Sequence, residues 1–233
     1  MINIPKISKR LEAASSFAES NSVIADVGTD HAYLPIYLYA LGRVRGGVVS
    51  DINPGPLDRA KANLRGYGCE NVFDTVMTDG LSGIEKYGPD DIFILGMGGE
   101  LIVKIIDEAD WVKKRGIRLI LQPMTHPEIL REYLYSNGFA IIDELLVNED
   151  KIYHVICAEY AESVKREGTD NFELLFGKKN LEKKTEELFL LLNRTRDIYS
   201  ARLRGKAEAG ADADYEKEII ENIDGFLEKE KRK

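Results

Sequence analysis

Two aspartates on either side of a glycine are the first residues in this sequence whose types and spacing could support chemistry. Asp26 and Asp30 flank Gly28. The apolar run at residues 23–27 predicts a short strand before the glycine, and an amphipathic helix is predicted to begin near Leu34. A strand, a glycine turn and a helix in this order lie at the carboxyl edge of a doubly wound sheet, where ligands bind. Capping of the turn and the helix is the alternative role for the two carboxylates.

The side chains of this turn favour a cationic ligand. A dinucleotide-binding turn carries three glycines that let the backbone approach a pyrophosphate, whereas Asp30 and Ala32 occupy the second and third of these positions here. Negative charge at the turn disfavours a pyrophosphate and favours a positively charged ligand, such as the sulfonium and ammonium of S-adenosylmethionine. We therefore assign cofactor binding to Asp26, Gly28 and Thr29.

Polar and glycine-rich segments follow the next predicted strands and extend this candidate site. Asp51 comes 25 residues after Asp26 and suits hydrogen bonds from ribose hydroxyls, although helix capping is its alternative role. Asp79 could accept from an adenine amino group while Leu81 packs on the ring, and Asp-Gly is also a common turn. The glycines within residues 96–99 let the backbone pass flat against a planar ligand or base. The cofactor candidates on these segments are Asp51, Ile52, Asp79, Gly80, Leu81, Gly96, Met97 and Gly98.

Candidate substrate contacts come from the end of the fifth predicted strand and from basic residues. Gln122 can donate and accept beside the same cleft, and a satisfied turn glutamine is the equal alternative. Nine basic residues outnumber four acidic ones between residues 178 and 206, which suits phosphate contacts although the net charge of the chain is −8. Basic residues also stand at the start of a helix predicted at residues 7–19, where a solvated face is the alternative. The substrate candidates are Lys6, Lys9, Arg10, Gly99, Gln122, Pro123, Lys179, Lys183, Arg194 and Arg202.

The composition is that of a globular protein without a membrane segment or a metal site. Of 233 residues, 44% are apolar and 31% charged. No apolar run approaches the roughly 20 residues needed to span a bilayer, and the first residues lack a signal-peptide core, so we expect a cytoplasmic protein. Cys69 and Cys157 have no metal-ligand spacing and there are only three histidines, so we expect no metal and predict that both thiols are reduced. His154, inside a predicted strand, is interpreted as structural.

Alternating strands and helices must position these candidates. Apolar runs predict five strands, at residues 23–27, 47–52, 72–77, 91–96 and 117–122. The helices among them are predicted to begin near Leu34, Pro56, Leu81 and Gly99. Such alternation predicts parallel strands with right-handed crossovers. A helix at 127–137 and an antiparallel hairpin of residues 139–147 and 151–160 complete a predicted seven-stranded sheet.

From about residue 163 the strand pattern gives way to two heptad stripes. They run from Leu181 to Leu203 and from Tyr215 to Phe226, and they predict two long helices folded back on each other as a coiled-coil hairpin. We therefore predict two domains, an α/β domain at residues 1–162 and a C-terminal helical hairpin at residues 163–233.

These segments together resemble the bacterial tRNA (adenine(22)-N(1))-methyltransferases. The resemblance covers nearly the whole chain and rests on Asp26-Val-Gly-Thr-Asp-His-Ala-Tyr-Leu-Pro35, Ser50-Asp-Ile-Asn53, Asp79-Gly-Leu81, Gly96-Met-Gly-Gly99 and Leu121-Gln-Pro123. It implies a class I methyltransferase domain with a Rossmann-like seven-stranded sheet, S-adenosylmethionine as cofactor, and methylation of N1 of adenine 22 in the D-arm of tRNA. The sequence departs from the wider class I pattern at Asp30 and Ala32, where glycines are usual, and lacks the Asn-Pro-Pro-Tyr loop of many amino-methylating enzymes.

Methyl transfer to adenine needs no nucleophilic side chain, because N1 already carries a free lone pair. Positioning and desolvation can supply catalysis, with a carboxylate that stabilises the cationic product or takes a proton from the exocyclic amine. Asp30 is the first candidate for this carboxylate, and His31 and Tyr33 could orient or stack the base. These three residues are the predicted catalytic group.

Two other classes of function stay open from the residues alone. The helical hairpin could be the partner-binding arm of a noncatalytic module whose nucleotide site only regulates. Alternatively, the chain could methylate another RNA, a protein or a small molecule. We expect tRNA as the partner, no membrane and no metal, and a monomer rather than a homodimer.

Overall fold

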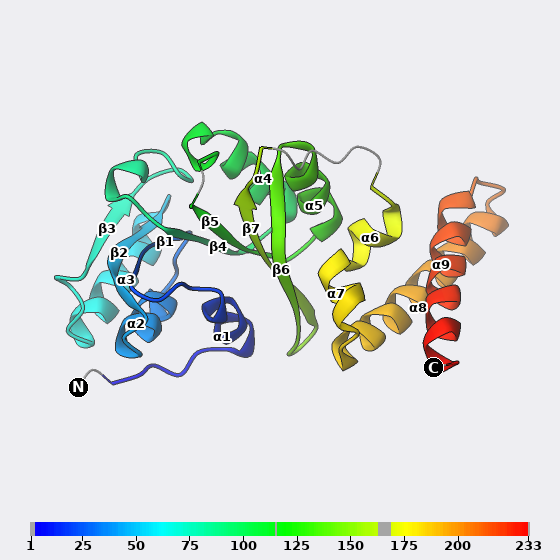
Figure 1. Cartoon of the computed structure of the whole chain (residues 1–233), viewed down its shortest axis with the longest axis horizontal. Coiled ribbons are helices and arrows are strands. Elements are labelled where there is room, and N and C mark those ends of the chain that lie inside the picture. The colour runs from blue at the N-terminus through cyan, green and yellow to red at the C-terminus, as the bar shows by residue number, and fades with distance from the viewer. Residues whose placement is uncertain (1–2, 115, 163–168, 233) are drawn as a thin grey trace. The chain divides into compact units, whose positions relative to one another are not determined.

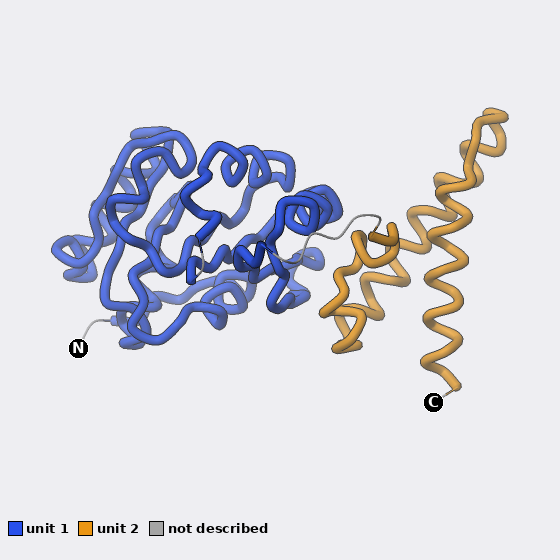
Figure 2. The backbone as a smooth tube through the Cα atoms, turned by 45° about the horizontal axis from the view of Figure 1, so that its top comes forward, with its two compact units in different colours: residues 1–167 blue, residues 168–233 orange. Residues whose placement is uncertain are grey.

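The chain divides into two compact units, residues 1–167 and residues 168–233 (Figure 2). The computed structural model describes residues 3–114, 116–162 and 169–232. Residue 163, at which the sequence predicts the second domain to begin, lies outside the described residues, so the boundary between residues 162 and 163 stays a prediction. No helix in these ranges is both long and apolar enough to cross a membrane.

A seven-stranded sheet in the order β3-β2-β1-β4-β5-β7-β6 forms the centre of the first unit (Figure 1). Five parallel strands and a C-terminal hairpin make up the sheet, which confirms the predicted architecture, and β7 runs antiparallel to both of its neighbours. The strands are β1 (Ser22–Val27), β2 (Val44–Asp51), β3 (Phe73–Met77), β4 (Asp91–Met97), β5 (Arg118–Pro123), β6 (Phe139–Asn148) and β7 (Ile152–Tyr160).

Helices cover both faces of this sheet. The helices α1, α2 and α3 lie on one face, and α4 and α5 lie on the other (Figure 1). Because the central strands are covered on both sides, they are continuous apolar runs, and residues 92–94 and 119–121 are completely buried. The helices are α1 (Lys9–Ser16), α2 (Tyr33–Ala40), α3 (Pro54–Gly66), α4 (Gly99–Asp107) and α5 (Pro127–Ser136).

The prediction of a helix that begins near Leu81 is wrong. The segment after β3 forms turns and then a short 3₁₀ helix at Glu85–Tyr87. Gly80 and Gly83 both have positive φ, at 53° and 70°, which no α-helix can contain. Leu81 is 2% exposed, so its apolar side chain supports the core from a turn instead.

The second unit contains two long helices preceded by two short ones. The long pair, α8 (Glu186–Glu208) and α9 (Asp214–Lys231), confirms the predicted hairpin, while α6 (Asn171–Phe176) and α7 (Lys178–Lys183) were not predicted. Lys184 has a left-handed φ of 54° and ends α7, so the stripe predicted from Leu181 onward is interrupted there.

His154 and the two cysteines agree with the sequence interpretation. His154 is 7% exposed, and its Nδ1 lies 2.9 Å from Nη2 of Arg131, whose Nε donates to Glu144 at 2.7 Å. Burial and the neighbouring guanidinium hold the pKa of His154 well below its usual value. Cys69 and Cys157 are free and buried.

Candidate functional site

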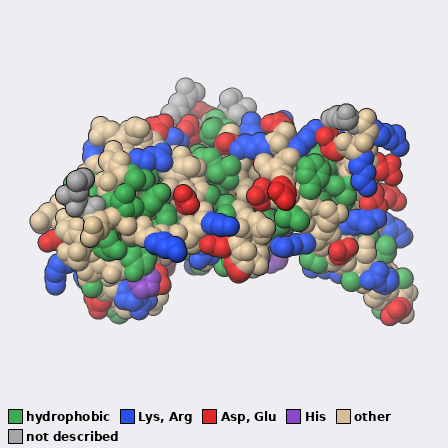
Figure 3. Space-filling view, turned by 90° about the horizontal axis from the view of Figure 1, so that it is seen from below, with side chains coloured by type: hydrophobic (Ala, Val, Ile, Leu, Met, Phe, Trp, Pro, Cys, Tyr) green, Lys and Arg blue, Asp and Glu red, His purple; other side chains and the backbone are tan. Residues whose placement is uncertain are grey.

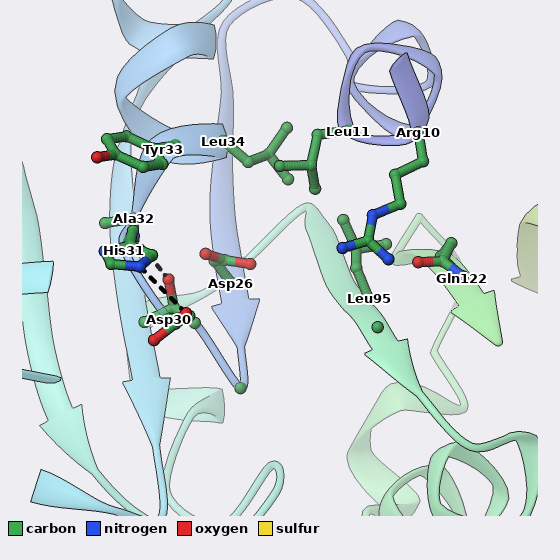
Figure 4. A pocket seen from close by; sticks show the side chains of 13 residues that line it. Arg10, Leu11, Asp26, Asp30, His31, Ala32, Tyr33, Leu34, Leu95 and Gln122 are labelled. Atoms are coloured by element: carbon green, nitrogen blue, oxygen red, sulfur yellow. Dashed lines mark hydrogen bonds and ion pairs between the residues drawn. The ribbon is translucent and has the colours of Figure 1, made fainter. Parts of the chain in front are cut away.

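A pocket of about 330 Å³ opens at the carboxyl edge of the sheet (Figure 4). The strand order reverses direction between β1 and β4, and ligands of open α/β sheets bind in the crevice at this switch point. The volume is within the range of small-molecule sites. The pocket is lined by the turn at residues 28–34, by Asp26, Leu95, Gly96 and Gln122, and by Arg10 and Leu11 of α1.

Backbone hydrogen bonds fix the turn that follows β1. Gly28 has a φ of 74°, and the N–H groups of Gly28 and Thr29 both donate to the Ser50 carbonyl, at 2.8 and 2.9 Å. The Thr29 hydroxyl accepts from the N–H of Ala32 at 3.0 Å, while Ala32 has a left-handed φ of 54° at the start of α2. These contacts hold the turn against the end of β2, as the predicted strand, glycine turn and helix require.

Asp26 is a buried carboxylate at the end of β1. Its side chain faces the pocket (Figure 4), and the residue is 8% exposed. Burial raises the pKa of Asp26 to about 6, although a hydrogen bond from the Thr29 hydroxyl opposes the shift. In the described part of the chain no cation forms an ion pair with this carboxylate, so at neutral pH a negative charge without an ion-pair partner lines the pocket. A cationic group on a ligand fits this place.

The three predicted catalytic residues lie together on the other end of the same turn. Nε of Arg59, from α3, donates to Oδ1 of Asp30 at 3.0 Å, and Nη2 also pairs with it. Nε2 of His31 lies 3.1 Å from Oδ2 of Asp30. The His31 ring stacks on Tyr33 with centroids 5.3 Å apart, and the His31 carbonyl accepts from Asn63 at 3.0 Å. Because Asp30 already faces a guanidinium, its carboxylate is held and partly neutralised, and its catalytic role stays a prediction.

Gln122 and Arg10 line the opposite side of the pocket. Gln122, in β5, is 1% exposed, and its Nε2 donates to the Pro123 carbonyl at 3.0 Å. Arg10 extends from α1 toward Gln122 and Leu95 (Figure 4). Its Nη1 lies 3.3 Å from Sδ of Met124. The structure therefore brings two of the predicted substrate residues together with four of the predicted cofactor residues, Asp26, Gly28, Thr29 and Gly96.

The candidates after β2 and β3 lie outside this pocket. Asp51 lies on the same edge of the sheet, but its Oδ1 accepts from the Asn53 N–H at 2.7 Å, which is the turn role that the sequence left open. Ile52 is 56% exposed. Asp79 and Leu81 line a second cavity of about 190 Å³. Gly80, between them, packs on Ile105 of α4.

The glycine segment after β4 mainly lets two loops approach each other. A Cβ on Gly99 would collide with the His126 carbonyl oxygen and lie 2.9 Å from that of Thr125, and the Gly99 N–H donates to Thr125 at 2.8 Å. This packing accounts for Gly99 without a ligand. A Cβ on Gly98 would lie 3.2 Å from the Thr125 hydroxyl, and the Met97 methyl occupies the space that a Cβ on Gly28 would need. Gly96 has a φ of 77°, and a Cβ there would meet nothing within 4 Å, so this residue leaves open space in the pocket that Asp26 also lines.

The predicted RNA-contacting residues are spread over both units. Lys6 and Lys9 are exposed beside the start of α1, while Pro123 is buried at the end of β5. In the C-terminal unit, Figure 3 shows basic and acidic side chains interspersed. Several cations of the 178–206 segment are paired, namely Lys179 with Glu182, Lys184 with Glu230, Arg196 with Asp224 and Lys206 with Glu216. Lys183 ends α7, and Arg194 and Arg202 lie on α8, where the Arg202 guanidinium is 5.0 Å from the Tyr199 ring centroid.

Sequence reasoning missed Arg59 and the apolar lining of the pocket. Arg59 is 29 residues from Asp30 in sequence, and no local pattern links them. Leu11, Leu34 and Leu95 line the pocket, and the sequence placed each of them in a predicted helix or strand without a role at the site.

Comparisons with known proteins agree on one family. A methyltransferase-domain profile matches residues 7–156. The tRNA (adenine(22)-N(1))-methyltransferase of Bacillus subtilis is 38% identical over 159 residues, which are 68% of this chain and 67% of that protein. The solved structure of the B. subtilis m1A22 tRNA methyltransferase TrmK superposes with a TM-score of 0.80 at 30% identity and covers 96% of each chain. A Streptococcus pneumoniae structure in complex with S-adenosyl-L-methionine gives a TM-score of 0.84 at 27% identity, covering 95% of this chain and 100% of that one. These similarities confirm the resemblance predicted from the sequence.

Proposed function

We propose that this chain, which belongs to the tRNA (adenine(22)-N(1))-methyltransferase family, transfers the methyl group of S-adenosylmethionine to N1 of adenine 22 in tRNA. The observation that carries the proposal is the pocket at the β1/β4 switch point, in which the buried Asp26 carboxylate forms no ion pair with a cation of the described residues. This charge suits the positive groups of the cofactor, and the pocket is large enough for part of it.

The residues that would hold the cofactor lie at the end of β1, in the turn after it, and at the glycine near the end of β4. Asp26 supplies the negative charge, Gly28 and Thr29 supply a fixed backbone, and Gly96 leaves room for a ligand. Asp51, at the neighbouring strand end, is our candidate for the ribose hydroxyls, after release of its turn hydrogen bond. When bound, S-adenosylmethionine supplies an electrophilic methyl group on a sulfonium.

The remaining chemistry requires positioning of the base and exclusion of water. The lone pair of adenine N1 attacks the methyl carbon, so that an N–C bond forms as the S–C bond breaks and the positive charge moves to the methylated base. Leu11, Leu34 and Leu95 provide the apolar walls that strip water from the reacting groups. His31 and Tyr33, already stacked on each other, are our candidates for contacting the base, and Asp30 is our candidate for stabilising its charge.

We assign tRNA backbone contacts to cations of both units. The N-terminal candidates are Lys6, Lys9 and Arg10, and those of the C-terminal unit are Lys179, Lys183, Arg194 and Arg202. With this assignment we propose two domains, a methyltransferase domain at residues 1–162 and an RNA-contacting helical domain at residues 163–233. We propose that the enzyme acts as a monomer in the cytoplasm.

The test is incubation of an unmodified tRNA transcript with labelled S-adenosylmethionine, followed by nucleoside analysis. We expect 1-methyladenosine from a transcript with adenine at position 22 and none from a matched transcript with guanine there. Cofactor binding without methyl transfer would favour a noncatalytic module. Transfer to both transcripts would place the methyl group at another position and contradict the proposal.

A further inference from the structure

Gln122 combines deep burial with an unused hydrogen-bond acceptor at the pocket. The side chain lies at the carboxyl edge of β5 and is 1% exposed. Its amide nitrogen is committed to the protein, because Nε2 donates to the Pro123 carbonyl at 3.0 Å and lies 3.6 Å from Sδ of Met124. Among the residues that the structure describes, none donates to Oε1. The oxygen is therefore the group that Gln122 offers to a ligand.

The hydrogen bond to Pro123 fixes which end of the amide faces the pocket. Rotating the amide by half a turn would place Oε1 against the Pro123 carbonyl oxygen, and two acceptors would then face each other in a buried place. In Figure 4 the oxygen of Gln122 is turned toward the Arg10 guanidinium and the pocket. The buried side of the site thus presents an acceptor whose direction the protein itself determines.

The edge of adenine that receives the methyl group matches this acceptor. N1 is an acceptor atom, and the adjacent exocyclic 6-amino group is a donor, whereas guanine has a protonated N1 beside an O6 acceptor. We propose that Oε1 of Gln122 accepts a hydrogen bond from the 6-amino group of the target adenine and thereby selects adenine over guanine. This inference rests on the proposed function, which supplies the substrate base.

The order of the strands supports the placement. The cofactor candidate Asp26 lies in β1 and Gly28 directly follows that strand, whereas Gln122 lies in β5. The strand β4, with Leu95 and Gly96, lies between β1 and β5. A base on the Gln122 side would therefore face a methyl donor on the Asp26 side across the space that Gly96 leaves open. A glutamine oxygen discriminates well here, because leaving a buried acceptor without a donor is costly.

The test pairs a change in the protein with a change in the base. Wild type and Gln122→Met, which keeps the length of the side chain but removes the acceptor, are each given tRNA with adenine or with purine, which lacks the 6-amino group, at position 22. We expect wild type to prefer adenine by roughly 10- to 100-fold in kcat/KM, and we expect Gln122→Met to lose this preference through a loss on adenine alone. A second variant, Gln122→Glu, keeps an acceptor toward the base but places its other oxygen against the Pro123 carbonyl, so we expect it to keep the preference at a lower rate on both bases.

Two controls separate this role from a structural one. Asn137→Leu removes another side-chain amide that donates to a backbone carbonyl, at 2.9 Å, outside the pocket, and should leave the adenine-to-purine ratio unchanged. Arg10→Ala tests whether Gln122 acts only by supporting Arg10. In that case the loss of kcat/KM should be the same on adenine and on purine. The inference is wrong if wild type methylates adenine 22 and purine 22 equally well. It is also wrong if Gln122→Met still prefers adenine over purine. If wild type methylates neither transcript, the proposed function itself fails.

Discussion

Replacing Asp26 by asparagine should stabilise the ligand-free protein at neutral pH while weakening its affinity for S-adenosylmethionine. Burial raises the pKa of Asp26 from 3.8 to about 6, so the folded protein binds this proton more tightly than the unfolded chain does. The free energy of unfolding therefore falls as the pH rises from about 4 to about 6, and it stays low above that range. Asparagine carries no charge, so the free energy of unfolding of the variant does not fall in this pH range.

The size of the effect follows from the two pKa values. A pKa difference of one corresponds to about 1.4 kcal/mol, so the shift from 3.8 to about 6 costs the wild type about 3 kcal/mol above pH 6. At pH 5 both states are partly protonated, and about half of this cost is present. The advantage of Asp26→Asn should therefore grow by about 1.4 kcal/mol between pH 5 and pH 8.

The assay is urea unfolding of both proteins at pH 5 and pH 8, with calorimetry of S-adenosylmethionine binding over the same range. The affinity of wild type should rise with pH up to about 6 and then level off, because the cationic ligand requires the ionised carboxylate. The variant should bind roughly 10- to 100-fold more weakly, with little pH dependence. Asp30→Asn is the matched control, since the Asp30 side chain is 62% exposed and should show no such gain in stability.

Two results would refute this reasoning. A variant that is less stable than wild type at pH 8 would mean that the Asp26 carboxylate contributes favourable contacts which outweigh its burial. Equal pH dependence of binding in both proteins would mean that the ligand does not place a positive group near Asp26.

Three further changes test the loops and the C-terminal helices. Gly99→Ala should lower the free energy of unfolding in urea by roughly 1–3 kcal/mol, because the new Cβ would collide with the backbone of the loop after β5. An unchanged free energy of unfolding would show that this loop moves aside at no cost. Arg59→Ala should lower kcat by roughly 10- to 100-fold in steady-state assays, because the turn after β1 loses its ion pair, while cofactor affinity is largely kept. A loss of cofactor affinity alone would contradict the catalytic assignment. Replacing Arg194 and Arg202 by glutamine should flatten the slope of log tRNA affinity against log salt by up to roughly 0.7–0.9 per phosphate contact. Arg196→Gln, whose parent guanidinium pairs within the helical hairpin at 2.6 Å, is the control and should change the slope less.

The elements that position the site were readable from local patterns. The apolar runs of β1, β4 and β5 reflect burial on both faces of a parallel sheet, because such burial requires apolar side chains at consecutive positions. The turn after β1 was readable because glycine at position 28 permits the positive φ that the turn needs. The helix expected near Leu81 failed, because an apolar residue between two glycines can be buried equally well from a turn.

The tertiary structure alone decided which partners the polar groups of the site have. The sequence named Asp30 and Gln122, but it could not say that Arg59 holds the first or that the Pro123 carbonyl takes the amide nitrogen of the second and leaves its oxygen to the pocket. It also named Asp26, but the raised pKa comes from burial by several elements. Strand patterns and turns depend on neighbours along the chain, and a sequence records those directly. Hydrogen bonds and desolvation depend on distances of a few ångströms between segments far apart in sequence, and only packing fixes those distances.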